Sequence, residues 1–571
     1  MKLALPCLLF LLLATTLARA ADLPARTSVQ VARASQGMVV SETPHASRVG
    51  RDVLTRGGNA VDAAVATAFA LAVTWPEAGN IGGGGFMMVH PADGKPPVCV
   101  EYRETAPAAA TETMFELGES RYNCKAVGVP GTVGGLQLAH ESFGRLPWRD
   151  IVMPAVRLAE SGFVVDDWLA YSTNKVLEQE NVRLGDRYAE LRRVYSHPQG
   201  RPWRKGDVMV LLDLARTLRT IAERGGNAFY EGRIADLLVA EMQRGNGIIS
   251  KQDLEGYRAK IRKPIGGTYR GYDLYGPPPP CSGGTCVIET LNILEPFKLR
   301  EHPRFGARNL HLIAEAARRA FADRAKYLGD PDFTSIPKHL TGKEYAAKLA
   351  GAIKLDEATP SEAIAPEIQL ADESPDTTHF SVIDGDGMGV SNTYTLEASW
   401  GSRIVVPGAG FLLNNEMGDF NWKRGHTDRK GRIGTDANLI RPGKRMLSSQ
   451  SPFIVARDGK VVLLTGSPGG RTIINTVLGN ILNVLEFEMP IDKAIDTARL
   501  HHQWFPDEIT FEGTKSDEHA SAVKKLRDWG HTVRYRSRQG SAHSIHVDLK
   551  TSKYVGVADW RRGGFAAGHS Q

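Results

Sequence analysis

The chain has 571 residues, of which 42% are hydrophobic and 23% are charged, and its formal net charge is +6. This length exceeds what one hydrophobic core usually organises, so we expect two or more packed units with the composition of an ordinary soluble enzyme. The basic residues are scattered and form no long run, which argues against nucleic acid as a partner.

The N-terminus has the pattern of an export signal. Lys2 is followed by an apolar stretch over residues 3–17, and Ala18-Arg19-Ala20 matches the small-x-small pattern of a cleavage site. The stretch is short for a membrane span, and an uncleaved anchor is the alternative. We therefore predict that residues 1–20 are a signal peptide. The mature protein is then expected to be periplasmic or secreted, without contact with the membrane.

Four cysteines remain once the predicted signal peptide is removed, and export would permit disulfides between them. Cys281 and Cys286 are close in sequence, but no histidine lies beside them, so a metal site has little support. Two structural bridges or four buried thiols are the preferred interpretations, and the pairing stays open. The four residues are Cys99, Cys124, Cys281 and Cys286.

The chain from about residue 36 to residue 350 is expected to be mostly helical, with interspersed strands. Asn59 is placed to cap an Ala-rich helix that begins at the next residues. Residues 208–223 and 310–328 carry apolar side chains at helical spacing. Residues 351–376 are acidic, contain proline and show little periodicity, so we predict an exposed linker there.

After residue 376 the pattern changes to strands joined by tight turns. Residues 378–383 and 388–396 flank the turn Asp384-Gly385-Asp386-Gly387, which predicts a hairpin. Hairpins combined with packed helices indicate an α+β layered unit. Two further hairpins are predicted over 453–465 and 544–558, and helices over 471–485, 491–500 and 519–529.

Thr377 stands where the linker changes into the first of these strands, which suits a residue that becomes a chain terminus. A freed α-amine, whose pKa is about 7.7–8.0, could act as the base for the hydroxyl of the same residue. That hydroxyl could first attack the carbonyl of Asp376, and hydrolysis of the resulting ester would release the new terminus. The alternative is a threonine placed by its strand propensity alone.

The sequence around Thr377 resembles the processing site of the γ-glutamyltranspeptidases, and the resemblance extends over about residues 36–565. Single glycine runs are weak signals, but the motifs of this family occur here in the family's order. Before Thr377 they are Gly57 to Ala64, Ile81 to Phe86, Tyr102 to Pro107 and Val129-Pro130-Gly131. After it they are Thr393-Tyr394-Thr395-Leu396, Asn414 to Phe420, Leu447 to Pro452 and Gly466 to Gly470.

The resemblance implies the fold, the activity and the partners. The fold would be the four-layer αββα sandwich of N-terminal-nucleophile hydrolases, built from two interleaved fragments, residues 21–376 and 377–571. These large and small subunits would form a heterodimer. The activity would be that of a γ-glutamyltransferase and glutathione hydrolase, in which Thr377 takes the γ-glutamyl group and water or an acceptor amino acid or dipeptide removes it. No metal or organic cofactor is required.

The resemblance also implies the residues that carry the reaction. Thr377 would be the nucleophile, and the hydroxyl of Thr395 would orient it. Gly469 and Gly470 would form the oxyanion hole, because backbone N–H groups on a glycine turn can face a developing oxyanion without obstruction.

A second group of residues would bind the free amino-acid head of the γ-glutamyl group. Arg103, aided by Ser448 and Ser449, would hold the α-carboxylate. Glu416 and Asp419 would hold the α-ammonium, together with Glu397, which stands where many members of the family have asparagine. Taken singly, each could instead be a surface ion pair, a solvated face or a turn residue.

The segment 421–438 is about as long as the family's substrate lid, but it is basic and has no aromatic residue after Trp422. We therefore predict a mobile cover that leaves the acyl-enzyme open to water, which favours hydrolysis over transfer.

Two other functions stay open as alternatives. A related acylase acting on glutaryl or cephalosporin-type amides would share the processing but would not need an acidic pocket for an ammonium group. An uncleaved, inactive periplasmic binding protein would keep the fold without the chemistry. The acidic residues Glu397, Glu416 and Asp419 argue against the first, and the intact Thr377 argues against the second.

Overall fold

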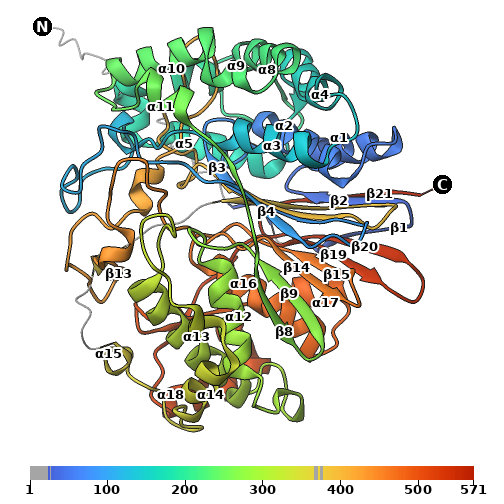
Figure 1. Cartoon of the computed structure of the whole chain (residues 1–571), viewed down its shortest axis with the longest axis vertical. Helices are drawn as coiled ribbons and strands as arrows, with labels where there is room; N and C mark the ends of the chain where they lie inside the picture. Colours follow the sequence, from blue (N-terminus) through green and yellow to red (C-terminus); the bar gives the residue numbers. More distant parts are fainter. Residues whose placement is uncertain (1–22, 26, 366–370, 373–376, 571) are drawn as a thin grey trace, which may run out of the picture.

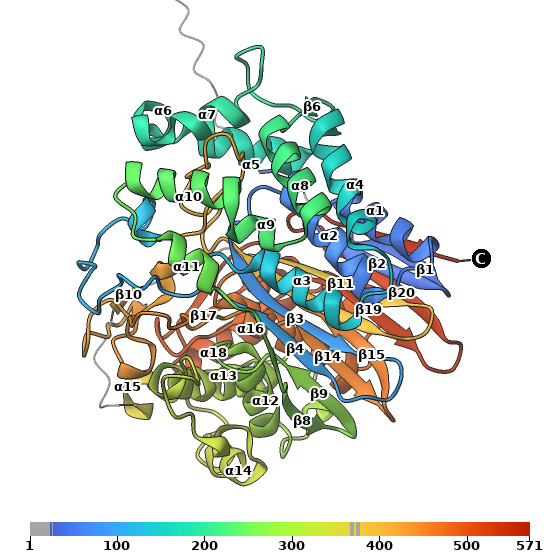
Figure 2. The ribbon, with the colours of Figure 1, turned by 45° about the horizontal axis from the view of Figure 1, so that its top comes forward.

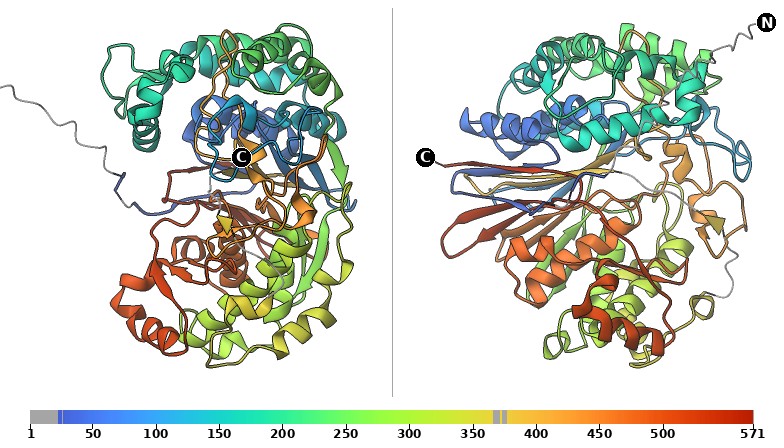
Figure 3. Two further views of the ribbon diagram at one scale, coloured as in Figure 1. Left: turned by 90° about the vertical axis from the view of Figure 1, so that its left-hand side faces the viewer. Right: turned by 180° about the vertical axis from the view of Figure 1, so that it is seen from behind.

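The computed structural model describes residues 23–25, 27–365, 371–372 and 377–570. The predicted signal peptide and Asp376 lie outside the described residues. Two seven-stranded sheets lie face to face, and a layer of helices covers the outer face of each (Figure 1). Viewed from behind, the sheets are seen between the two helical layers (Figure 3). This arrangement confirms the predicted αββα sandwich.

The first sheet has the strand order β21-β2-β11-β12-β3-β4-β7, and every neighbouring pair in it is antiparallel. Three of its strands come from the chain after residue 377 and four from the chain before it, so the two predicted fragments share the sheet. The strands are β2 (Gly37–Ser41), β3 (Gly84–His90), β4 (Val98–Tyr102), β7 (Lys260–Arg262), β11 (Thr378–Asp384), β12 (Gly389–Thr395) and β21 (Phe565–His569).

The second sheet has the order β1-β20-β19-β15-β14-β9-β8. It also contains strands from both predicted fragments, three from the chain before residue 377 and four from the chain after it. Its second hairpin, β14 with β15, and its third, β19 with β20, are those predicted from the sequence. The strands are β1 (Gln30–Ala34), β8 (Ile265–Tyr269), β9 (Tyr272–Gly276), β14 (Phe453–Arg457), β15 (Lys460–Thr465), β19 (His543–Asp548) and β20 (Lys553–Ala558).

The core between the sheets is apolar, with Met38, Phe86 and Ile383 of the first sheet packed in one cluster with Ile454 and Leu464 of the second. Burial of such side chains contributes about 1.5–3 kcal/mol each to folding. Each outer face of the sandwich has its own cluster, which joins one sheet to the helices that cover it.

The first sheet is covered by helices from the first half of the chain, and α2, which is buried along its whole length, lies against it (Figure 2). This layer contains α1 (Pro44–Thr55), α2 (Ala60–Thr74), α3 (Thr132–Phe143), α4 (Trp148–Ser161), α5 (Asp167–Glu178), α6 (Glu180–Leu184), α7 (Ala189–Tyr195), α8 (Leu212–Arg224), α9 (Asn227–Tyr230), α10 (Gly232–Arg244) and α11 (Lys251–Gly256).

The second sheet is covered by helices drawn from both predicted fragments (Figure 1). They are α12 (Gly283–Leu294), α13 (Ala307–Tyr327), α14 (Lys343–Gly351), α15 (Ser361–Ile364), α16 (Thr472–Ile481), α17 (Ile491–Asp496) and α18 (Ala520–Asp528). Within the described ranges, none of the helices has the length and apolar character needed to cross a membrane.

Local signals in the sequence explain several element boundaries. The Asn59 side chain accepts hydrogen bonds from the N–H groups of Val61 and Asp62, and the Asp62 carboxylate accepts the N–H of Asn59, which makes the predicted cap a full capping box. The helix predicted over 208–223 begins only at Leu212, because Val208–Met209 forms strand β6 against β5 (Phe163–Val164).

The first part of the predicted linker, residues 351–364, is largely exposed as expected, but it is anchored to the protein at Ser361. Ser361 is fully buried, its hydroxyl donates to the carbonyl of Trp504 at 2.6 Å, and Arg318 donates to that hydroxyl at 2.6 Å. The Ser361 amide donates to the carboxylate of Asp507. Further on, β10 (Ala371–Asp372) pairs with β13 (Gly431–Arg432). Hydrogen bonds of polar side chains therefore hold this segment in place. They leave no periodic apolar pattern in the sequence, so a search for periodicity does not detect them.

The four cysteines of the mature chain are all buried and carry free thiols, so the structure agrees with buried thiols rather than with disulfide bridges. Burial raises the pKa of Cys281 to about 12 and the pKa of Cys124 to about 12, which keeps both thiols protonated.

Candidate active site

The register of one strand pair brings the two predicted threonines together. Thr378 in β11 lies opposite Tyr394 in β12, so the same antiparallel register places Thr377 opposite Thr395. Residues directly opposite each other on antiparallel strands present their side chains on the same face of the sheet. Thr377 is only 4% exposed, and the hydroxyl of Thr395 accepts the N–H of Glu397 at 2.9 Å.

The glycine turn lies between the end of β15 and the start of α16. Gly469 has φ +131° and Gly470 has φ +57°, both in the region that favours glycine. A Cβ atom at position 469 would lie 2.5 Å from Oγ1 of Thr472, which is too close for a side chain to fit without movement. The turn therefore requires glycine at 469 for both conformation and space.

Arg103 is fully buried in a cluster of carboxylates. Its Nη1 lies 2.7 Å from Oε2 of Glu416 and 3.4 Å from Oε2 of Glu104, and its Nη2 lies 2.5 Å from Oδ2 of Asp419. Its Nε donates to the carbonyl of Met446 at 3.3 Å. The cluster thus contains one guanidinium and three carboxyl groups, all withdrawn from water except part of Asp419.

The pKa values of the cluster follow from burial and charge. Burial opposes the charge of Arg103, but Glu416, Glu104 and Asp419 outweigh it and raise the pKa of the guanidinium. Burial raises the pKa of Glu104 to about 7 and raises that of Glu416 well above its usual value. The cluster therefore holds one guanidinium cation among three carboxyl groups, two of which burial pushes toward the protonated form.

This geometry revises the expected arrangement of the head pocket. The sequence suggested a basic end and an acidic end, whereas Arg103 contacts both Glu416 and Asp419 directly. Glu104, which sequence reasoning missed although it lies within a family motif, belongs to the same cluster.

The two predicted serines, Ser448 and Ser449, have hydrogen-bond partners outside the Arg103 cluster. The hydroxyl of Ser448 accepts the N–H of Gln450 at 3.1 Å, and the hydroxyl of Ser449 accepts a hydrogen bond from Nη2 of Arg324 at 2.9 Å. Arg324 comes from α13 and also donates to the hydroxyl of Ser282. Sequence reasoning missed Arg324, because the basic residues of the helix over 310–328 were interpreted only as its polar face.

Glu397 has a partner that the sequence did not indicate. Its Oε1 lies 2.5 Å from Nη1 of Arg121, and its backbone has φ +79°, which is rare for a residue with a side chain. A Cβ atom added to Gly418 would lie 3.1 Å from Nη1 of Arg121, so the guanidinium packs against the 416–419 turn. Arg121 belongs to no recognised motif.

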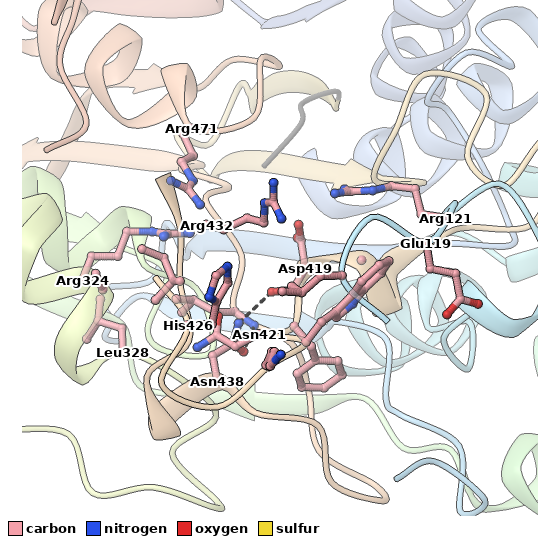
Figure 4. A pocket seen from close by; sticks show the side chains of 18 of the residues that line it. Glu119, Arg121, Arg324, Leu328, Asp419, Asn421, His426, Arg432, Asn438 and Arg471 are labelled. Carbon is pink, nitrogen blue, oxygen red and sulfur yellow. Dashed lines mark hydrogen bonds between the residues drawn. The ribbon is translucent and has the colours of Figure 1, made fainter. Parts of the chain in front are cut away.

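A cavity of about 140 Å³ lies beside these residues and includes Asp419 in its lining (Figure 4). The loop 421–438 forms much of its wall. At the two ends of that loop the N–H of Asn421 donates to the carbonyl of Asn438, and Trp422 stacks on Phe115. The cationic residues of the lining are Arg121, Arg324, Lys423, Arg432 and Arg471.

Comparison with known proteins gives consistent matches over nearly the whole chain. A family model described as "Gamma-glutamyltranspeptidase" matches residues 46–569. The chain is 43% identical over 542 residues to a glutathione hydrolase proenzyme of Escherichia coli (strain K12), covering 93% of this chain and 91% of that protein.

Solved structures are similar as well. A cephalosporin acylase from Bacillus halodurans has a TM-score of 0.85 at 28% identity, covering 96% of this chain and 98% of that one. A gamma-glutamyltranspeptidase from Helicobacter pylori has a TM-score of 0.54 at 40% identity, covering 56% of this chain and 93% of that one.

The sandwich and these likenesses together define an N-terminal-nucleophile hydrolase fold. The family match spans most of the chain and the identity to a curated relative exceeds 40%. The chain belongs to the gamma-glutamyltranspeptidase family.

Proposed function

We propose that the chain is the precursor of a self-processing glutathione hydrolase and γ-glutamyltransferase with Thr377 as its nucleophile. The observation that carries this proposal is the contact of the buried Arg103 with Glu416 and with the partly exposed Asp419, because these groups offer opposite charges to one small zwitterion. The relatives named glutathione hydrolase proenzyme support it independently.

The proposed processing step uses the hydroxyl of Thr377. Its oxygen attacks the carbonyl carbon of Asp376, the C–N bond breaks, and the nitrogen takes up a proton to become the α-amine of Thr377. Water then hydrolyses the ester, which leaves a carboxylate on Asp376 and a free hydroxyl on Thr377. The resulting fragments, residues 21–376 and 377–571, remain together as a heterodimer because both sheets contain strands from each.

The proposed turnover uses the same hydroxyl on an external amide. The α-amine of Thr377 accepts the hydroxyl proton, and the oxygen attacks the γ-carbonyl of the donor. The N–H groups of Gly469 and Gly470 stabilise the oxyanion. The amine leaves with a proton, and water or an acceptor amine then removes the γ-glutamyl group from Thr377. Export to the periplasm or the medium forms part of this proposal.

Binding of the donor would exchange ionic partners within the Arg103 cluster. The α-carboxylate would take a place on the Arg103 guanidinium, and the α-ammonium would lie against Glu416 and Asp419. Hydroxyl groups of Ser448 and Ser449 would complete the site, with Arg324 positioning Ser449. Glu397, held by Arg121, contributes to the negative charge near Glu416.

The acylase alternative is favoured by the high TM-score of the cephalosporin acylase and by relatives named acylase proenzyme. An acylase for glutaryl amides has no ammonium group to bind, so the buried excess of carboxylates would have no purpose in it. This chemical argument favours the γ-glutamyl donor.

The test compares two donors that differ only in the α-ammonium group, γ-glutamyl-p-nitroanilide and glutaryl-p-nitroanilide. N-terminal sequencing of the purified protein establishes processing before Thr377 in the same preparation. We expect a new terminus at Thr377 and a strong preference for the γ-glutamyl donor in kcat/KM. Equal or better turnover of the glutaryl donor would favour the acylase, and an active uncut chain would contradict the proposed mechanism.

A further inference from the structure

Glu42 carries a buried carboxylate that the proposed reaction does not use. It lies between β2 and α1, and its side chain is fully buried. Its Oε2 lies 2.8 Å from Nε2 of His543 and accepts a hydrogen bond from the hydroxyl of Ser541 at 3.3 Å. One carboxylate thus contacts two residues of the segment that leads into β19.

The burial of Glu42 is costly, which calls for a reason other than folding. Its second oxygen, Oε1, has no hydrogen-bond partner among the described residues. An unsatisfied oxygen of a buried carboxylate lowers stability, whereas an apolar side chain of similar size would fill the same space without this penalty. Groups that are kept at such a cost concentrate where a protein carries out its function.

The segment that leads into β19 lies directly against the glycine turn. The N–H of Ser541 donates to the hydroxyl of Ser467 at 2.9 Å, and that hydroxyl donates to the carbonyl of Pro468 at 2.7 Å. A Cβ atom at Gly540 would lie 2.4 Å from Oγ of Ser467, so the two stretches of chain are in close contact. Ser467 and Pro468 immediately precede Gly469, whose N–H is proposed to face the oxyanion.

The same segment is tied to the strand of the proposed nucleophile. The hydroxyl of Ser381, in β11, donates to the backbone carbonyl of His543 at 2.9 Å. Strand β11 follows Thr377 directly. Residues 541–543 therefore join the strand of the nucleophile to the loop that contains the proposed oxyanion donors, and Glu42 contacts both ends of this short segment.

We propose that Glu42 is a positioning residue for the glycine turn, which it supports by fixing residues 541–543 between the turn and the nucleophile. The inference rests on the proposed function, in which Thr377 reacts and the N–H groups of Gly469 and Gly470 stabilise the oxyanion. Such donors must be held within about 0.5 Å of their place in the transition state. Loss of their support therefore slows the reaction without weakening the binding of the donor.

The test separates the rate of the chemical steps from the binding of the donor. We measure kcat, per processed chain, and KM for γ-glutamyl-p-nitroanilide, together with the thermal unfolding midpoint. The variants are Glu42→Ala, Ser541→Ala and the double substitution. Ser541→Ala removes the hydroxyl that contacts the carboxylate but keeps the backbone N–H that donates to Ser467.

We expect Glu42→Ala to lower kcat about 5- to 50-fold and to leave KM within about twofold of the wild-type value. KM is unaffected because the turn stabilises the oxyanion both when the acyl-enzyme forms and when it is hydrolysed. Ser541→Ala should lower kcat in the same way. The double variant should lose no more kcat than Glu42→Ala alone, since both substitutions break the same connection.

The matched control is Glu241→Ala. Glu241, in α10, is another buried glutamate, and it forms an ion pair with Arg244 at 2.5 Å. Its replacement should lower the unfolding midpoint, because it removes a partly buried pair, and should leave kcat unchanged.

A purely structural role of Glu42 would lower the unfolding midpoint of Glu42→Ala but not its kcat, and this result would overturn the inference. Additive losses of kcat in the double variant, or a rise in KM in place of a fall in kcat, would contradict it as well. If Glu42→Ala does not fold, Ser541→Ala decides alone, and an unchanged kcat in that variant refutes the proposal.

The proposed function and the role of Glu42 can fail separately, because the glycine turn would stabilise the oxyanion of any amide donor. If the wild type prefers glutaryl-p-nitroanilide, the γ-glutamyl function is wrong, while the same comparison of kcat and KM on that donor still tests Glu42. Hydrolysis of neither donor by the processed wild type would overturn both.

Discussion

Arg121 and Glu397 form an ion pair in which Nη1 and Oε1 are 2.5 Å apart, and the glutamate side chain is only 3% exposed. The Arg121 guanidinium balances the charge of the buried Glu397 carboxylate. A buried carboxylate without its cation would pay a desolvation penalty that the pair avoids.

This pair gives the first prediction, which concerns stability. Arg121→Ala should lower the thermal unfolding midpoint more than Arg121→Ala/Glu397→Asn, with a coupling energy of about 0.5–3 kcal/mol between the two sites. The uncut Thr377→Ala background is the right material, since a single chain unfolds without dissociation of fragments. Strictly additive effects of the two substitutions would show that the pair contributes nothing to folding.

The second prediction concerns processing. Thr377→Ala should leave a single chain on a denaturing gel, because the hydroxyl oxygen is required for the acyl shift. Thr377→Ser keeps a hydroxyl and should still be cut, although more slowly. The neighbouring Thr378→Ala, which changes a buried strand residue, serves as the control and should be cut like the wild type. Cutting of Thr377→Ala at position 377 would refute self-cleavage by this residue.

The third prediction concerns the head pocket. Arg103→Ala should weaken the binding of γ-glutamyl donors by about 2–5 kcal/mol, because it removes a charge-assisted contact and leaves Glu416 and Asp419 without their cation. Arg103→Lys should bind these donors with an affinity between those of the wild type and Arg103→Ala, since lysine keeps the charge but not the forked set of N–H donors. KM and the unfolding midpoint are measured together. A correctly processed Arg103→Ala protein with unchanged KM would exclude Arg103 from the donor site.

The fourth prediction concerns the glycine turn. Gly469→Ala places a Cβ within 2.5 Å of Oγ1 of Thr472 and should displace the turn, lowering kcat by about 10²–10³ if its N–H groups stabilise the oxyanion. Gly459→Ala is a matched control, because Gly459 also has positive φ but has open space at its Cβ position. Similar losses of kcat in both variants would point to general strain rather than to an oxyanion hole.

The fifth prediction concerns acid stability and comes from the histidines near the anchored segment at Ser361. Burial, followed by the charges of His311 and Arg318, lowers the pKa of His531 to about 3, and burial with Arg318 lowers the pKa of His502 to about 4. Both lie below the unfolded value of about 6.5, so the unfolded chain binds more protons between these limits. Stability is therefore greatest above pH 6.5 and falls as the pH is lowered.

The measurement is the unfolding free energy of Thr377→Ala between pH 4.5 and 6.5, above the range in which the nearby carboxyl groups of Asp507 and Glu315 contribute most. Each of the two histidines should add about 1 kcal/mol per pH unit to the dependence of the unfolding free energy on pH. His531→Gln should remove the contribution of one histidine. A slope that does not change in His531→Gln would show that this histidine is not the source.

Much of the fold could be predicted from the sequence, because its strongest signals are local. The hairpin from 378 to 396, the cap at Asn59 and the helix over 310–328 depend on turn chemistry and periodicity within a few residues. The anchored segment could not, since Ser361 is held by Arg318 and Asp507, which are distant in the chain.

In the candidate site, too, the residues in local motifs could be predicted and the residues that act through distant contacts could not. Thr377, Arg103 and the glycine turn stand in motifs; the strand register places Thr377 opposite Thr395, and Arg103 contacts Glu416 and Asp419. The residues that sequence reasoning missed, Arg121 and Arg324, act through single side chains that reach the site from other elements. Such contacts leave no periodic or spacing signal along the chain.

The pairing of β2 with β11 and β21 affects the order in which the first sheet can assemble. Strand β2, from the first 41 residues, lies between β11 and β21, and β21 ends at His569. The first sheet therefore joins strands that lie far apart in the chain, and contacts this distant are slow to form. A truncated chain keeps an open edge at β2, which is a template for unwanted pairing with other chains. Synthesis of β21 is thus required before β2 has its second neighbour in the sheet.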